Sequence, residues 1–88
     1  MNLTNEQKED LRHTVREALV LRHPAALSAR QLVKPVKKEL AFLFEEADLT
    51  AALELLRGLK HAEWTLDELG GTKYWRATSE GVLAQERS

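Results

Sequence analysis

The hydrophobic pattern changes its period at Ala62, and this change limits the possible folds more than any other feature. Residues 63–67 (EWTLD) alternate between apolar and polar, as on a strand with one buried face. Gly70-Gly71 supplies the backbone angles of a tight turn, and residues 72–78 (TKYWRAT) then alternate again. The sequence therefore predicts a β-hairpin at residues 63–77.

The two tryptophans are expected to anchor this hairpin. Trp64 and Trp75 each lie on the apolar face of their strand, so we expect both to be substantially buried in one core. Thr78 or Ser79 is a suitable N-cap, which predicts a short final helix after the hairpin.

The part of the chain before Ala62 has a helical period. Thr4 and Gln7 fit a capping box, and from Leu11 apolar residues follow at i, i+4, i+7 and i+8. Pro24 disfavours helical geometry in the residue before it. We therefore expect the first helix at residues 5–22.

A second capping box, Ser28 with Gln31, begins the next helical segment. Its apolar residues keep one phase past Pro35; they are Leu32, Val33, Val36, Leu40, Leu43, Phe44 and Ala47. Because an interior proline kinks or breaks a helix, residues 28–46 are interpreted as one bent helix or as two collinear ones.

Asp48 is a suitable N-cap for a third helix at residues 49–60. The predicted buried stripe of this helix is Leu49, Ala52, Leu53, Leu56 and Leu59. Its outward face includes Thr50, Ala51, Glu54 and Arg57.

Three helices followed by a hairpin and a short helix resemble the winged helix-turn-helix domains. In those domains a leucine-spaced third helix leads into a strand, and the wing returns as an aromatic, an alternating residue and then Thr-x-x-Gly. The matching residues are Leu53, Leu56, Leu59, Trp64, Tyr74, Ala77, Thr78 and Gly81. The resemblance covers nearly the whole chain and implies an α+β fold: a three-helix core, a β-hairpin wing and a short C-terminal helix. The segment from Ser28 to Asp48 is longer than usual for the family.

Composition limits the function. At 88 residues we expect a single domain, 1–88, and the absence of cysteine excludes disulfides and thiolate metal sites. The polar N-terminus predicts no signal peptide, no apolar run approaches the roughly 20 residues of a membrane span, and we expect a cytoplasmic protein. Because the net charge is −1, any nucleic-acid site requires a local excess of positive charge.

One such excess lies on the second helix. Arg30, Lys34, Lys37 and Lys38, here called the basic row, are spaced i, i+4, i+7 and i+8 with no acid between residues 28 and 38. They could each meet a phosphate of DNA, although a solvated helix face explains the spacing equally well.

The resemblance implies that the third helix enters the major groove of DNA while the second touches the backbone. Arg57 could then bind guanine, Glu54 could accept from cytosine, and Thr50 and Ala51 would permit close approach. The wing is mixed in charge: Asp67 and Glu68 precede its turn, and Lys73 and Arg76 follow it. This mixture counts against simple DNA binding.

Catalytic motifs are lacking. His13, His23 and His61 lie in different predicted elements without ligand spacing, and Gly70-Gly71 is too isolated for a phosphate loop. We expect no enzyme, metal or cofactor.

Two functional hypotheses remain. The first is a winged-helix protein that binds double-stranded DNA as a transcriptional regulator or accessory factor. The alternative is a protein-interaction module that does not bind DNA. It would use Phe42, which lies outside the apolar arc of its helix, with the third-helix or wing surface. Neither hypothesis involves a membrane.

Overall fold

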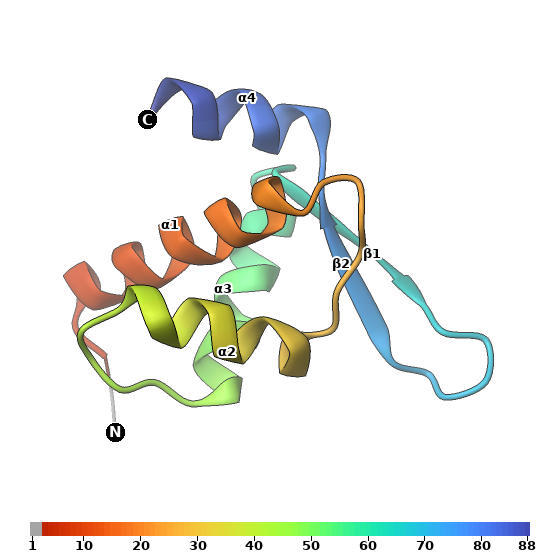
Figure 1. Cartoon of the computed structure of the whole chain (residues 1–88), viewed down its shortest axis with the longest axis horizontal. Coiled ribbons are helices and arrows are strands. Elements are labelled where there is room, and N and C mark those ends of the chain that lie inside the picture. The colour runs from red at the N-terminus through yellow and green to blue at the C-terminus, as the bar shows by residue number, and fades with distance from the viewer. Residues whose placement is uncertain (1–2) are drawn as a thin grey trace.

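Three helices, a two-stranded hairpin and a final helix follow one another in the computed structural model, which describes residues 3–88. Met1 and Asn2 of the expected 1–88 domain lie outside the described residues. The elements are α1 (Asn5–Leu21), α2 (Ala29–Glu39), α3 (Glu46–Gly58), β1 (Ala62–Leu66), β2 (Lys73–Ala77) and α4 (Ser79–Arg87). Figure 1 shows the hairpin projecting away from α1, α2 and α3. In residues 3–88 no helix is long and apolar enough to cross a bilayer.

The first two helices begin at the predicted capping boxes. Before α1, the Thr4 hydroxyl accepts from the Gln7 backbone N–H at 3.1 Å, and the Gln7 side chain accepts from the Thr4 N–H at 2.9 Å. Ser28 and Gln31 make the same reciprocal pair before α2, at 3.2 and 2.9 Å. These bonds satisfy backbone donors that the first helical turn leaves free.

The expectation of a helix through residues 28–46 was wrong. Although Pro35 is accommodated inside α2, the helix ends at Glu39 because Leu40 adopts an extended conformation (φ −107°, ψ 142°). The following loop places Phe44 in the core and leaves Leu43 85% exposed. The apolar residues after Leu40 continue the helical spacing, but they lie in a loop. This loop turns the chain from α2 to α3, and Phe44 is buried from it.

The third helix starts earlier than residue 49. Its N-cap is Glu45, and Asp48, which was expected to be the N-cap, occupies the N3 position. The Asp48 carboxylate accepts from the Glu45 backbone N–H at 2.9 Å. An acidic group also interacts favourably with the positive end of the helix dipole.

The predicted hairpin is present, in the register Trp64 opposite Trp75. Leu27 forms an isolated antiparallel bridge with Trp75 on the other side of β2. The Leu27 N–H donates to the Trp75 carbonyl at 2.8 Å, and the Trp75 N–H donates to the Leu27 carbonyl at 2.7 Å. Trp75, flanked on both sides, is 1% exposed. Trp64 is more exposed than Trp75 because its strand is the edge of the sheet, but it also packs against the core, as expected.

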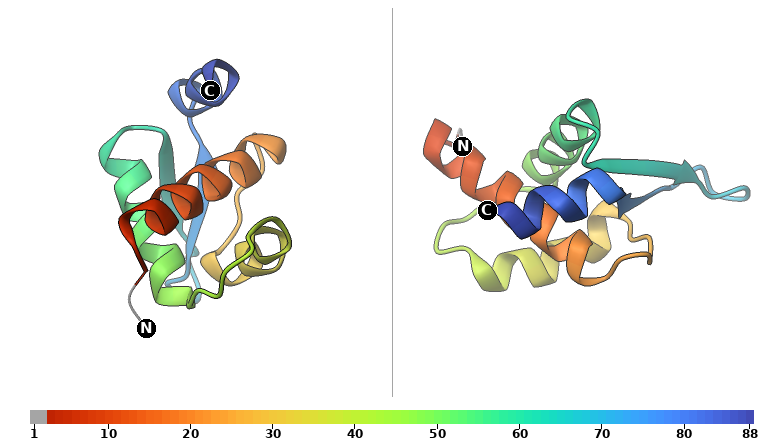
Figure 2. Two further views of the ribbon diagram at one scale, coloured as in Figure 1. Left: turned by 90° about the vertical axis from the view of Figure 1, so that its left-hand side faces the viewer. Right: turned by 90° about the horizontal axis from the view of Figure 1, so that it is seen from above.

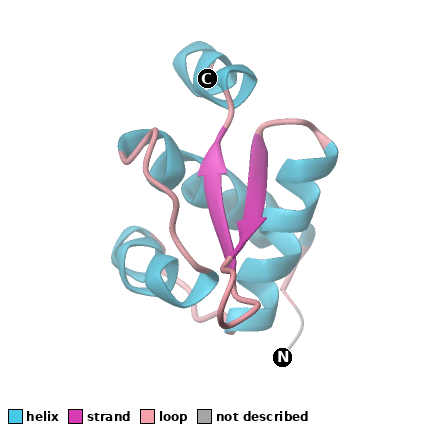
Figure 3. Ribbon diagram, turned by 90° about the vertical axis from the view of Figure 1, so that its right-hand side faces the viewer, coloured by secondary structure: helices cyan, strands magenta, loops and turns pink. Residues whose placement is uncertain are grey.

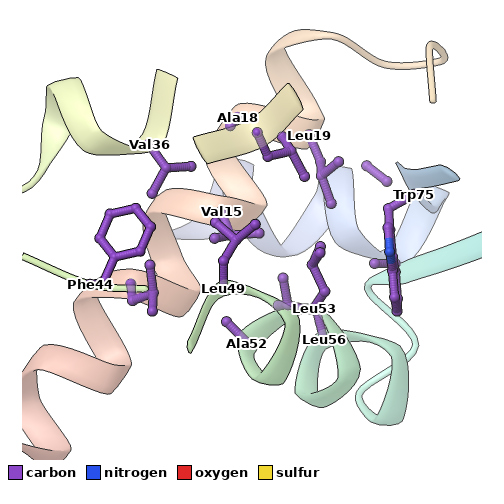
Figure 4. Packing of buried hydrophobic residues seen from close by; sticks show 14 residues of the cluster. Val15, Ala18, Leu19, Val36, Phe44, Leu49, Ala52, Leu53, Leu56 and Trp75 are labelled. Carbon is purple, nitrogen blue, oxygen red and sulfur yellow. The ribbon is translucent and has the colours of Figure 1, made fainter. Parts of the chain in front are cut away.

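The core lies where α1, α2 and α3 meet the inner face of the hairpin (Figure 4). Leu53 and Leu56 are central to it, at 0% and 1% exposed, as predicted from their spacing. Leu59 was expected in this stripe but is 49% exposed, because it is the C-cap residue, after α3 has ended at Gly58.

The Thr-x-x-Gly sequence docks α4 on the turn between α3 and β1. The Thr78 hydroxyl donates to the Lys60 carbonyl at 2.6 Å and accepts from the Gly81 N–H at 3.0 Å. The Thr78 N–H donates to the His61 carbonyl at 3.1 Å. Arg16 of α1 donates to the Gln85 side chain at 2.9 Å, so α4 is fastened to α1 as well, beside which it lies in Figure 2.

Candidate nucleic-acid interface

An open groove runs between the start of α2, the first half of α3 and the returning strand of the hairpin. Its volume is about 600 Å³. Three predicted site residues from three different elements line it: Arg30, Thr50 and Lys73. Figure 3 faces the end of the molecule from which the hairpin projects, with helices on both sides of the strands.

The basic row is divided between two surfaces. Arg30 borders the α2–α3–hairpin groove, whereas Lys34 and Lys38 line a second groove of about 320 Å³ between α1 and α2. Glu17 and Arg22 also line this second groove. In the described residues, no member of the row forms an ion pair with an acid, so α2 keeps its positive charge available.

The cations of the third helix and the wing are paired instead. Glu54 contacts Arg57 (Oε2 to Nε, 3.4 Å) and Lys73 (Oε1 to Nζ, 3.6 Å). The Lys73 ammonium also lies 4.5 Å from the centre of the Trp64 ring, within cation–π range. One carboxylate therefore links α3 to β2, and of these three charged residues only Lys73 lines the α2–α3–hairpin groove.

Arg76 lies on the other face of the hairpin from Lys73, because alternate residues of a strand point to opposite faces. It donates to Glu63, its cross-strand partner, at 2.7 Å. The structure therefore does not bring Arg76 together with the groove residues.

Ala51 also lies apart from that groove. It lines a small, mainly apolar groove of about 170 Å³ between α1 and α3, with Leu11 and Leu55. Thr50 and Ala51, adjacent in sequence, thus face different surfaces.

Several groove residues were missed from the sequence. Glu46, Gly71 and Thr72 line the α2–α3–hairpin groove. Glu46 was missed because the third helix was expected to begin three residues later. Gly71 and Thr72 could have been proposed from their place at the start of the returning strand, since loops at the end of rigid elements often carry function.

Phe42, expected outside the apolar arc of its helix, is covered by the chain itself. Phe42 lies in the loop after α2, is partly buried and packs against the core. It was placed outside the apolar arc because residues 28–46 were interpreted as helical, whereas α2 ends at Glu39. The exposed apolar side chain of this loop is Leu43.

The histidines are dispersed in the structure as in the sequence. A His61 ring nitrogen lies 3.3 Å from the Arg16 guanidinium, and His23 is hydrogen-bonded to the Ala77 carbonyl at 3.1 Å. Across residues 3–88, no group of three or more His, Cys, Asp or Glu residues is arranged to hold a metal ion.

Comparison with known proteins rests on structure, because no family model and no curated protein matches the chain. A transcriptional regulator from Clostridium thermocellum superimposes with a TM-score of 0.72 at 16% identity, over 98% of this chain and 84% of that one. A mutant of ZitR from Lactococcus lactis in its apo form gives 0.63 at 17% identity, over 93% of this chain and 58% of that one. The likeness extends through the helices and the hairpin, and the chain has the winged helix-turn-helix fold.

Proposed function

We propose that this protein binds double-stranded DNA, as a transcriptional regulator or an accessory DNA-binding factor. The observation that carries the proposal is the α2–α3–hairpin groove, in which Arg30, Thr50 and Lys73 converge from three elements. The similarity to a transcriptional regulator supports it. This role agrees with the cytoplasmic location expected from the sequence.

The second and third helices differ in net charge. α2 carries the four cations of the basic row against Glu39, whereas α3 carries Glu46, Asp48 and Glu54 against Arg57. Phosphate contacts therefore fall to α2, and α3 is suited to contacting base edges, as in helix-turn-helix domains generally. Affinity should depend mainly on α2, and sequence preference on α3.

A salt titration with random-sequence duplex DNA tests the proposal. If the duplex contacts all four cations of the basic row, the slope of log K against log salt concentration should be near −3 to −4. Arg30→Gln should weaken this slope by about one. The matched control is Arg87→Gln, which removes an exposed cation at the end of α4 and should leave the slope unchanged. Absence of binding at about 1 mM duplex at low salt would refute the function.

The protein-interaction alternative is favoured by one observation at the hairpin tip. Leu66 and Leu69 are 54% and 98% exposed beside Asp67 and Glu68, a combination unsuited to contact with phosphates. If this alternative is correct, the wild-type protein binds no duplex. If DNA binding is correct, Leu69→Ser leaves duplex affinity unchanged.

A further inference from the structure

The single carboxylate of Glu54 contacts two cations, Arg57 and Lys73, of which Lys73 lines the α2–α3–hairpin groove. We propose that Glu54 is a specificity-determining residue, which holds Arg57 and Lys73 until duplex DNA offers a cytosine amino group to replace them. The inference rests on the proposed DNA binding and concerns how that surface discriminates among sequences.

The geometry uses both oxygens of the carboxylate. Oε2 lies 3.4 Å from the Arg57 Nε, and Oε1 lies 3.6 Å from the Lys73 Nζ. Lys73 is also held over the Trp64 ring. In the absence of DNA, Arg57 and Lys73 are therefore both directed at Glu54.

Exposure makes this arrangement exchangeable. The side chains of Glu54, Arg57 and Lys73 are 39%, 54% and 45% exposed. Ion pairs this exposed are weak, so phosphate and guanine oxygens can compete for both cations. Exchange leaves Glu54 facing the DNA without its partners.

The base edges then decide the outcome. Guanine and thymine present acceptors in the major groove, which repel a carboxylate, whereas cytosine presents its N4 amino donor. Adenine also presents a donor, but beside the N7 acceptor. A carboxylate that is left without a hydrogen-bond donor in the complex costs binding free energy. Glu54 should therefore favour a cytosine at the base pair that it contacts.

The chain provides a matched control for testing this. Glu63 and Arg76 form a comparable exposed pair, at 2.7 Å with side chains 50% and 46% exposed, but on the opposite face of the hairpin. Glu54→Gln and Glu63→Gln remove the same charge, the first from two ion pairs and the second from one. A generic charge effect would make the two variants equivalent.

Binding to random duplex should separate them. Each cation released to a phosphate should strengthen binding about eight-fold at 0.1 M monovalent salt and make the slope more negative by about 0.9. On duplex without the favoured cytosine, wild-type Glu54 keeps Arg57 and Lys73. We therefore expect Glu54→Gln to bind random duplex more tightly, with a slope more negative by about one to two. Glu63→Gln should stay within about two-fold of wild type. Thermal melting of each variant checks that the fold is retained.

Selection from a randomised duplex pool tests the cytosine. The wild type should enrich cytosine at one position by about 5- to 100-fold, and Glu54→Gln should lose that preference. Unchanged binding by Glu54→Gln, equal effects of the two variants, or a preference that survives in Glu54→Gln would each overturn the role of Glu54. Absence of duplex binding by both wild type and Glu54→Gln would instead refute the proposed function itself, and this inference with it.

Discussion

Gly81 lies in the first turn of α4, pressed against the backbone of the turn between α3 and β1. A Cβ built at this position would lie 2.1 Å from the His61 carbonyl oxygen and 3.0 Å from its carbonyl carbon. Contacts between real atoms of this kind stay beyond about 3 Å because of hard-sphere repulsion. Gly81→Ala therefore requires α4 or the turn to move by about 1 Å.

The cost of this movement can be estimated from the contacts that it disturbs. The His61 carbonyl accepts from the Thr78 N–H, and weakening that bond costs about 0.5–1.5 kcal/mol. Overpacking adds about 1–3 kcal/mol, whereas alanine in place of glycine returns up to about 1 kcal/mol of helix propensity. We expect Gly81→Ala to destabilise the fold by about 1–3 kcal/mol, which would lower Tm by roughly 5–20 °C.

Gly58 is the matched control. It is the last residue of α3 and exposed, and a Cβ there would meet nothing within 4 Å. Gly58→Ala should therefore leave stability unchanged or raise it by up to about 1 kcal/mol. Thermal and urea unfolding, followed by circular dichroism, measure both variants. A Gly81→Ala protein as stable as Gly58→Ala would show that α4 does not pack on this turn.

Three further outcomes are expected. Leu56→Ala should cost about 2–5 kcal/mol in urea unfolding because it opens a cavity in the core, and a loss below about 1 kcal/mol would mean that α3 buries a different face. Thr78→Val removes the hydroxyl that bonds Lys60 and Gly81 and should cost about 0.5–2 kcal/mol by the same assay, so a neutral result would contradict its capping role. The double variant Lys34→Gln/Lys38→Gln should weaken the salt slope of DNA binding by about two if DNA spans the whole basic row, whereas an unchanged slope would confine phosphate contact to the α2–α3–hairpin groove.

The elements of the fold were largely determined by the sequence, because the features that specify them act over a few residues. Capping boxes involve residues three apart, and a hairpin turn involves Gly70-Gly71 and its flanking strands. Such features predicted the helix starts at Asn5 and Ala29 and the hairpin, whereas the pairing of Trp64 with Trp75 was seen only in the structure. The buried stripe of α3 followed in the same way, except at Leu59, where the helix had already ended.

Tertiary structure decided where α2 stops and which site residues meet. The spacing of apolar residues after Leu40 fits a helix, but only packing against α1 and α3 shows that burying Phe44 requires a turn. The contact of Glu54 with Lys73 joins residues far apart in the chain. Whether Ala51 shares a groove with Thr50 depends on how α3 is rotated against its neighbours. Each of these depends on long-range contacts, which form only when the elements are assembled and which no pattern of neighbouring residues encodes.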